Sequence, residues 1–386
     1  MDYKMNTDEL LKILKDLVDI ESHYLKEGGE LNLAKKLGEI AEIEGLSVEY
    51  EEVTPDRNNI FISLKGNEEG KHIVLCGHMD TVSSEGMTIE PFNGYIEDGK
   101  FWGRGSVDMK GGLACMLYAM ILLKRQGFFP KGKVTLIGTV GEECPTNSDG
   151  AFALRRRGKF ADMAIVGEAT NLNIAAAHKG TMSLEVKIKG KAAHSSNPAL
   201  GDNAIYKAVE LIILIKDKLL PELDKRNHPL CGQATLNVGM IDGGIQNNIV
   251  PDRCMFSLNR RYIPGEEEKQ IVEEILALWR ELPYAFDDLS ISVLKETENR
   301  IPMETELDDP LVVRLLESCK RQGLNSVVNG VNYWTDGAHL RVGGIPTVVF
   351  GPGDIAQAHA AVEFIEISSM EKAVAVYVDF IKEMCN

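Results

Sequence analysis

The sequence has few of the features that would direct a protein to nucleic acid or to a membrane. Its 386 residues include 42 lysines and arginines against 58 aspartates and glutamates, which gives a formal net charge of -16, and no stretch is rich in basic residues. Nucleic acids and anionic membrane surfaces attract proteins through basic patches, so we expect neither as a partner. The longest aliphatic run, LIILI at 211–215, is too short to span a bilayer.

Cysteine is scarce and shows no pairing pattern. The seven cysteines are an odd number and include no CxxC pair, which favours free thiols in a reducing compartment. The first residues, MDYKMNTDELLKIL, lack the continuous apolar core of a secretion signal. We therefore expect a cytoplasmic protein, in which Cys144, directly after two glutamates, is a small filler residue rather than a redox centre.

The length of the chain and its pattern of elements predict two domains, because 386 residues exceed the size of one hydrophobic core. Helical periodicity over 8–20, 31–44 and 112–126 alternates with strand-like runs such as HIVLCG (72–77), KVTLIGTV (133–140) and ADMAIVG (161–167). After residue 298 the α/β pattern resumes: Asp309 caps a helix that begins at Pro310, a strand covers IPTVVFGPG, and a last helix covers 368–384. This alternation predicts an α/β fold with a mostly parallel sheet flanked by helices, formed by residues 1–176 and 298–386.

The middle of the chain follows another pattern. Strand-like alternation in TMSLEVKIKG, ATLNVGMI, RCMFSLNRRY and LSISVLKE is interrupted by two helical stretches, at 203–219 and 266–279. The resulting order β-α-β-β-α-β is that of a ferredoxin-like α+β unit. We place this insert at residues 177–297.

Acidic and histidine residues follow the apolar strands of the α/β part. His78 follows HIVLCG, Glu142 and Glu143 follow KVTLIGTVG, Glu168 follows ADMAIVG, and His359 follows TVVFGPG by a few residues. The carboxyl ends of strands in an open α/β sheet border the ligand crevice. Any one of these residues, taken alone, would be interpreted as a solvated surface side chain. Their recurrence at the same strand ends predicts a site of imidazole and carboxylate ligands, which suits zinc and related first-row metals.

Asp108 lies in the glycine-rich stretch GRGSVDMKGG, just before a predicted helix. In isolation it would be an N-terminal helix cap. Beside the other candidate ligands, an aspartate that bridges two cations is the better interpretation. A nucleotide-binding loop is excluded, because the stretch has neither GxGxxG spacing nor a Walker lysine followed by Ser or Thr.

Six motifs in this order resemble those of a known family. They are GHMDTV, GRGSVDMKGG, GEE, VGEAT, AAHSSNPALGDNAI and FGPGDIAQAH. They resemble a dinuclear metallohydrolase family that contains acetylornithine deacetylase, succinyl-diaminopimelate desuccinylase, aminoacylase and glutamate carboxypeptidase. The resemblance runs from about residue 8 to residue 384, and the motifs are most similar to those of acetylornithine deacetylase.

The resemblance implies a role for each residue at the strand ends. One metal would be held by His78 and Glu168, the other by Glu143 and His359, and Asp108 would bridge them. The two ions would be zinc, with cobalt as the other candidate. The Asp80 carboxylate would orient His78, and Glu142 would be the general base. The family also has a cis peptide after the bridging aspartate, here Asp108–Met109.

In the insert the resemblance implies a lid and dimerisation domain. His194 would reach the active site of the partner subunit in a homodimer and polarise the scissile carbonyl. Asn248 would help to bind substrate, and Arg261 would pair with a substrate carboxylate, as a guanidinium does well; neighbouring Arg260 keeps open the alternative of a surface arginine. Lys179 and, in the other domain, Gly353 would line the substrate cleft.

The predicted function is a metal-dependent amidohydrolase that removes an acyl group from a small N-acyl amino acid or diamino acid, of the acetylornithine deacetylase or succinyl-diaminopimelate desuccinylase type, as in amino-acid biosynthesis. In the family, Glu at the position of Glu168 goes with aminoacylase and carboxypeptidase specificities. A dinuclear zinc carboxypeptidase or dipeptidase is therefore the alternative. NYWTDGAHL (332–340) matches no single subfamily, which leaves the substrate open. A non-catalytic binding protein of the same fold would most naturally have lost Glu142 or a ligand, and none is missing.

Overall fold

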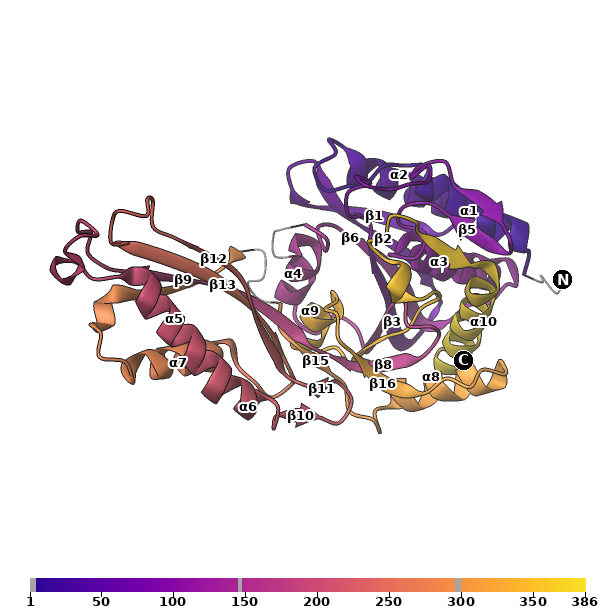
Figure 1. Ribbon diagram of the computed structural model, residues 1–386. Helices are drawn as coiled ribbons and strands as arrows, with labels where there is room; N and C mark the ends of the chain where they lie inside the picture. The colour runs from indigo at the N-terminus through magenta and orange to yellow at the C-terminus, as the bar shows by residue number, and fades with distance from the viewer. Residues whose placement is uncertain (1–4, 145–147, 296–299) are drawn as a thin grey trace. The chain divides into compact units, whose positions relative to one another are not determined.

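The computed structural model describes residues 5–144, 148–295 and 300–386. The chain divides into two compact units (Figure 1): unit 1 is residues 1–177, 303–330 and 335–386, and unit 2 is residues 178–302 and 331–334. The insert was expected at 177–297, and unit 2 additionally takes in residues 298–302 and the short segment 331–334. Its assignment as a lid and dimerisation domain stays a prediction.

Unit 1 is built on a nine-stranded sheet. Its strands, in spatial order, are β1 (Ser47–Thr54), β2 (Arg57–Lys65), β6 (Lys131–Thr139), β3 (Glu68–His78), β7 (Met163–Val166), β17 (Thr347–Val349), β8 (Ile174–His178) and β15 (Met303–Glu304), with β16 (Val328–Val331) paired to β8. The central strands β6, β3, β7 and β17 are parallel, whereas β1, β2 and β8 join antiparallel.

The sheet is thus mixed: a parallel centre of four strands is extended by antiparallel strands, within the predicted α/β fold of a sheet flanked by helices. The sequence pattern did not reveal β1, whose segment SVEYEEVT contains only half-exposed and exposed residues and has no buried face. The two-residue connection between β1 and β2 contains Asp56 in the left-handed region, with φ of 62°. Such a short connection can join only antiparallel neighbours, because a parallel pair needs a crossover of a dozen or more residues.

Helices flank this sheet. They are α1 (Thr7–Val18), α2 (Gly29–Ile43), α3 (Lys110–Arg125), α4 (Asp149–Arg156), α8 (Pro310–Arg321), α9 (Gly337–Val342) and α10 (Ile367–Met384). Helix α3 packs against α1 and α10, and residues 110–123 of α3 are all buried. A Cβ at Gly112 would lie 2.1 Å from the carbonyl oxygen of Gly167, so glycine allows α3 to approach the segment after β7. A small sheet of β18 (Phe364–Glu366), β5 (Lys100–Trp102) and β4 (Tyr95–Glu97) completes unit 1.

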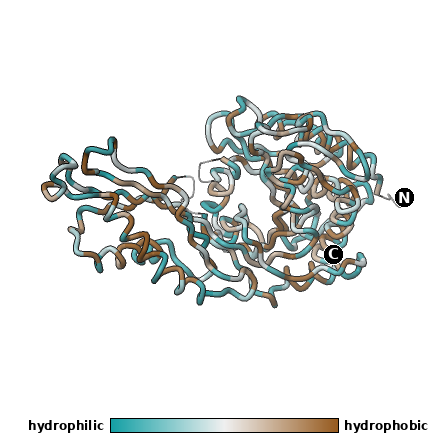
Figure 2. Tube along the Cα trace, in the orientation of Figure 1, coloured by the Kyte–Doolittle hydropathy of each residue, from teal (hydrophilic) through white to brown (hydrophobic). Residues whose placement is uncertain are grey.

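Unit 2 has the predicted ferredoxin-like order. It consists of β9 (Gly180–Lys189), α5 (Ala204–Leu214), β12 (Thr235–Gly243), β13 (Arg253–Tyr262), α7 (Glu268–Arg280) and β14 (Leu289–Val293), with the short α6 (Leu220–Leu223) and the hairpin β10 (Asn227–His228) and β11 (Gly232–Gln233) as additions. The antiparallel sheet has the order β12-β13-β9-β14, and α5 and α7 lie side by side on one of its faces (Figure 1). Alternate residues of β13 are buried, and they share one core with both helices, where Figure 2 shows hydrophobic stretches.

The parallel centre of the unit 1 sheet brings distant parts of the sequence to one edge. Strand β3 ends at His78, β6 ends shortly before Glu142, β7 ends shortly before Glu168, and β17 precedes the segment that leads to His359. Because β6, β3, β7 and β17 run in the same direction, all four carboxyl ends lie at the same edge.

All seven cysteines are buried free thiols, as the unpaired pattern predicts. Among the helices of residues 5–144, 148–295 and 300–386, none combines the length and hydrophobicity that a membrane span requires.

Candidate metal centre

Carboxylate and imidazole groups converge at the carboxyl edge of the unit 1 sheet. In the described part of the chain, three sets of side chains each hold potential ligand atoms within 4.8 Å of one another. They are His78 with Asp108 and Glu168, Asp108 with Glu143 and His359, and His78 with Glu142 and Glu143. The first two sets share Asp108, which is the arrangement that a bridging role requires. Ligation itself stays a prediction.

His78 is fixed by its own strand end. Its Nδ1 lies 2.9 Å from the backbone carbonyl oxygen of Asp80, so Nδ1 donates the ring proton there. The opposite nitrogen, Nε2, lies 3.0 Å from Oδ1 of Asp108 and 3.1 Å from Oε1 of Glu168. A histidine held in this way presents Nε2 to a metal, because the hydrogen bond at one nitrogen selects the tautomer.

The predicted role of Asp80 needs correction in this detail. Its carboxylate lies 3.6 Å from Nδ1 of His78, beyond hydrogen-bond range, so the backbone carbonyl orients the ring. The carboxylate instead accepts backbone N–H groups from Gly141, Glu142 and Glu143, at 3.2, 3.2 and 2.8 Å. Asp80 is fully buried, and it fixes the segment that carries both adjacent glutamates.

Asp108 is fixed through its backbone by a pair of residues that the sequence analysis missed. Glu363 accepts N–H groups from Val107 and Asp108 at 3.0 and 3.3 Å, and its other oxygen lies 2.6 Å from Nη1 of Arg104. Glu363 lies four residues after His359, and Arg104 belongs to the GRG stretch. Their closeness to two of the motifs is the sequence feature that could have indicated a role at this site. The Asp108–Met109 peptide is cis, as the resemblance implied.

Asp336 is a third residue that was not predicted. It is buried, and its carboxylate accepts hydrogen bonds from the hydroxyl of Thr139, at 2.6 Å, and from that of Ser148. Thr139 is the last residue of β6, so Asp336 ties the end of this strand to the residue that precedes α4. Asp336 lies in the segment NYWTDGAHL, which the motif comparison left unassigned.

Glu143 and His359 form the more open side of the centre. His359 Nε2 lies 2.7 Å from Oε1 of Glu143 and 3.3 Å from Oδ2 of Asp108. The side chain of His359 is 55% exposed, whereas that of Glu143 is 11% exposed. Glu142 is buried beside them. The centre is therefore reached from the side of His359.

The electrostatics show an excess of negative charge. Burial and the charge of Asp108 raise the pKa of Glu168 to about 7, and the same two causes raise the pKa of Glu143. Hydrogen bonds to Asp108 and Glu143 raise the pKa of His359 to about 10. Burial would lower the pKa of His78, but Glu168 and Asp108 outweigh it and hold that pKa well above its usual value. These carboxylates repel one another and hold the nearby imidazoles protonated, which shows that the cluster lacks a counter-cation. The donor set therefore fits divalent metal ions.

Two of the predicted substrate-binding residues lie beside one another at one end of unit 2. Lys179 is buried, and its Nζ donates to the carbonyl oxygen of Gln233 at 2.6 Å. Arg261 is half-buried, and burial and the neighbouring charge of Arg300 lower its pKa. Within the described residues Arg261 has no ion pair, whereas Arg260 is buried against Glu266, 2.5 Å away. Of the two arginines, Arg260 therefore serves the interior of unit 2, and the pairing of Arg261 with a substrate carboxylate stays a prediction.

The remaining predicted residues lie in loops. His194 is exposed, and its Nδ1 faces the hydroxyl of Ser196 at 2.7 Å. Asn248 is exposed, and its backbone carbonyl oxygen accepts the backbone N–H of Ser195. Gly353 of unit 1 is buried, with φ of 88°, and a Cβ there would lie 2.5 Å from Val107. The Gly353 backbone therefore packs against the segment that carries Asp108, and its role toward substrate stays a prediction.

Comparison with known proteins places the chain in a family. Residues 74–383 match the model of "Peptidase family M20/M25/M40". The chain belongs to this family. A relative from Staphylococcus epidermidis, "Probable succinyl-diaminopimelate desuccinylase", is 28% identical over 98% of each chain. The M20 fold is shared with aminopeptidase PepT from Bacillus cereus, at a TM-score of 0.81 and 23% identity over 98% of this chain and 99% of that one. It is also shared with the YXEP protein of Bacillus subtilis, described as a dinuclear metal binding peptidase, at a TM-score of 0.73 and 16% identity over 98% of each chain.

These matches agree with the resemblance found in the motifs. Membership of the M20 family makes the chain a metal-dependent hydrolase of the metallopeptidase and amidohydrolase type. The α/β fold with its inserted ferredoxin-like unit is that of its structural neighbours. Neither the acyl group nor the identity of the metal follows from relatives at this distance.

The shared position of Asp108 generates a prediction about cation binding. We expect Asp108→Asn to lower Co²⁺ binding at both donor sets, because it weakens a ligand common to them, and Glu168→Gln to lower it at one set only. Titration of the metal-free protein with Co²⁺, followed by visible absorption and by the metal content after gel filtration, measures this difference. Asp379→Asn, on the surface of α10, is the matched control. Equal losses in Asp108→Asn and Glu168→Gln would rule out the shared ligand.

Proposed function

We propose that the protein is a dinuclear metal amidohydrolase that removes an acyl group from small N-acyl amino acids or diamino acids. The observation that carries the proposal is the pair of donor sets that share buried Asp108, with Glu142 beside them. The relative named as a desuccinylase, aligned over 98% of each chain, supports hydrolysis that removes an acyl group. Zinc is the proposed metal and cobalt the other candidate, because imidazole and carboxylate ligands suit both.

The metal ligands would be His78 and Glu168 on one side, Glu143 and His359 on the other, and Asp108 between them. When bound, two divalent cations would supply Lewis acidity, which eases the ionisation of water and offsets charge on a carbonyl oxygen. The residues of the chain provide the remaining requirements: ligand orientation, a base and a fixed geometry.

In this proposal Glu142 is the general base. It is buried at the same strand edge, and its backbone N–H is held by Asp80, so its position relative to Glu143 is fixed. A carboxylate there takes a proton from the attacking water and passes it to the leaving nitrogen, after which the C–N bond breaks. One group performs both transfers because the leaving amine must gain the proton that the water loses.

A panel of substrates tests the reaction class. Purified protein with Zn²⁺ or Co²⁺ would be offered acetylornithine, succinyl-diaminopimelate, other N-acyl amino acids and dipeptides, with amine release as the measurement. We expect N-acyl amino acids to be cleaved, and a chelator to abolish turnover until the metal is restored. Cleavage of dipeptides alone would show a peptidase instead. Absence of chelator-sensitive turnover on the whole panel would contradict a hydrolase of this class.

A substitution of the base separates its role from that of its neighbour. Glu142→Gln keeps the size of the side chain and removes its basicity, so we expect kcat to fall by about 10²- to 10⁴-fold. Bound metal should stay at the wild-type level. The matched control is Glu317→Gln on the surface of α8. Loss of metal in Glu142→Gln, with metal retained in Glu143→Gln, would mean that the roles of the two glutamates are reversed.

We also propose a homodimer formed through unit 2. β12 is one of the two edge strands of its sheet, and Met240 and Ile241 on this strand are 71% and 54% exposed. Tyr206, on the first turn of α5, is 68% exposed. Hydrophobic side chains on an unpaired edge favour pairing with another strand, and a second copy supplies an identical one.

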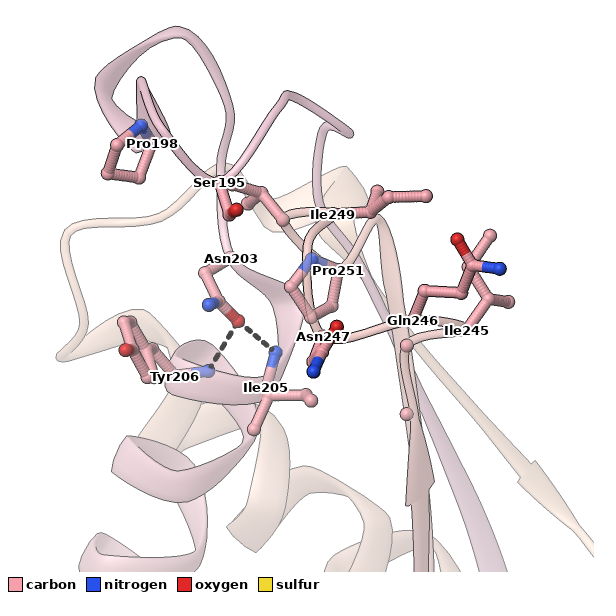
Figure 3. Close-up of a pocket in the computed structure, with 13 residues that line it drawn as sticks. Ser195, Pro198, Asn203, Ile205, Tyr206, Ile245, Gln246, Asn247, Ile249 and Pro251 are labelled. Atoms are coloured by element: carbon pink, nitrogen blue, oxygen red, sulfur yellow. Dashed lines mark hydrogen bonds between the residues drawn. The ribbon is translucent and has the colours of Figure 1, made fainter.

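A pocket lies in the same part of unit 2. Figure 3 shows residues that line it, among them Asn203 and Tyr206 at the start of α5 and residues of the segment 243–251. Its volume is about 630 Å³. Ser195, the residue after His194, also lines it. In the family resemblance, His194 belongs to the active site of the partner subunit. The proposed interface and the proposed trans-acting histidine thus lie on neighbouring segments.

Mixing two inactive variants tests the trans role. Glu142→Gln and His194→Ala should each be inactive as homodimers. In a heterodimer, one of the two sites combines an intact Glu142 with an intact His194 from the other chain, so the purified heterodimer should have roughly half of wild-type activity. Co-expression with two affinity tags, followed by purification and assay, measures the recovery. Activity of His194→Ala alone, or heterodimers without recovery, would contradict the proposal.

A further inference from the structure

Glu30 and Arg57 form a buried ion pair far from the metal-binding motifs in the sequence. Glu30 is the second residue of α2, and its side chain is 4% exposed. Arg57, the first residue of β2, contacts both carboxylate oxygens, with Nε 2.5 Å from Oε2 and Nη2 2.9 Å from Oε1. A buried carboxylate is costly unless it is paired and hydrogen-bonded, and the bidentate guanidinium meets this need.

The ion pair also contacts the segment that carries the two adjacent glutamates. Oε1 of Glu30 accepts the N–H of Gly141 at 2.9 Å, and Nη1 of Arg57 lies 3.6 Å from Sγ of Cys144. The two partners therefore hold residues on either side of Glu142 and Glu143. Gly141 has φ of 81°, and a Cβ there would lie 3.1 Å from Nη2 of Arg57, so glycine allows the guanidinium to approach.

The N–H of Gly141 is shared between two carboxylates. It lies 2.9 Å from Oε1 of Glu30 and 3.2 Å from Oδ1 of Asp80. Two buried carboxylates around one N–H repel each other, and Arg57 is the cation that pairs with Glu30 there. Without Arg57, Glu30 would retain its burial but lose its counter-charge. The Gly141 backbone would then keep Asp80 alone as its charged acceptor.

We propose that Glu30 and Arg57 are positioning residues for the general base, acting through the backbone of Gly141. The inference rests on the proposed function, in which Glu142 transfers the proton. A base displaced by a fraction of an ångström loses much of its effect while substrate binding changes little. The pair therefore acts on kcat rather than on KM, although neither residue touches the substrate.

The ion pair is accessible from outside. A surface pocket of about 200 Å³ is lined by Glu30 and Arg57 together with Tyr24, Pro55 and the start of α2. The side chain of Arg57 is 20% exposed. A guanidinium ion can therefore enter from solvent and replace the head group of a truncated arginine, which provides a test that overall loss of stability does not mimic.

Arg57→Ala is the test variant and Arg314→Ala, on the surface of α8, the control. We expect Arg57→Ala to lower kcat by about 10- to 100-fold, the usual range for a residue that supports a metal ligand without touching the metal, with KM nearly unchanged. Millimolar guanidinium chloride should restore part of kcat in Arg57→Ala and have no such effect on the control. Glu30→Gln, which keeps an acceptor for Gly141, should retain more activity than Glu30→Ala.

Amide hydrogen exchange of the peptide that contains Gly141 is the readout that needs no substrate. It should quicken in Arg57→Ala and slow again with guanidinium, while exchange in α8 and α10 stays at the wild-type rate. If the wild-type protein cleaves nothing on the panel, this readout still decides the positioning role. Unchanged kcat and local exchange in Arg57→Ala would overturn it. A general rise in exchange without guanidinium rescue, in Arg57→Ala and Glu30→Gln alike, would also overturn it.

Discussion

Repulsion among buried carboxylates is the constraint on which the rest of unit 1 depends. Asp108, Glu143 and Glu168 meet at one sheet edge with too little positive charge among them, so the pKa of Glu143 and that of Glu168 are raised. Left to itself, such a cluster would spread apart. The chain prevents this by holding the backbone rather than the charged groups: Asp80 accepts three N–H groups of the 141–143 segment, and Glu363 accepts two at residues 107 and 108. The side-chain oxygens stay available for cations.

Two glutamate–arginine pairs support the ligand-bearing segments in the same way. A buried glutamate accepts an N–H from a ligand-bearing segment and is paired with an arginine: Glu363 with Arg104 behind Asp108, and Glu30 with Arg57 behind Glu142 and Glu143. An uncharged acceptor would hold the same N–H with less force, because hydrogen bonds to ionised groups are stronger. The arginine makes the buried charge tolerable. This raises the cost of displacing either segment, at the expense of two further ionised groups in the interior.

The sequence predicted the convergence at the sheet edge because it depends on a local pattern repeated four times. An apolar strand followed by histidine or glutamate is visible in HIVLCGH, KVTLIGTVGEE and ADMAIVGE and, with a longer gap, in TVVFGPGDIAQAH, and parallel strands bring the ends together. Strand β1 was missed because its exposed, glutamate-rich segment has no buried face, and β8 because IAAAH has three alanines in a row and Ile174 as its one β-branched residue. The supporting residues were missed for a different reason. Glu30 and Asp336 have no local signature, since the contact of Glu30 with the base segment, at Gly141, spans 111 positions and that of Asp336 with Ser148 spans 188.

Asp80 takes part both in a contact that a local sequence pattern reveals and in contacts with residues far away in the sequence. Its role was therefore predicted only in part. Its spacing from His78 is a local signal and indicated an interaction between the two residues. Their contact is made by the backbone carbonyl of Asp80, and the carboxylate turns to the 141–143 segment, which is some 60 residues away in the sequence. Asp80 thus couples two strand ends: it fixes the tautomer of His78 with one group and the segment of the proposed base with another. A substitution at this position changes both at once, whereas the Glu30–Arg57 pair contacts only the second, and the effect of the base segment is therefore best isolated there.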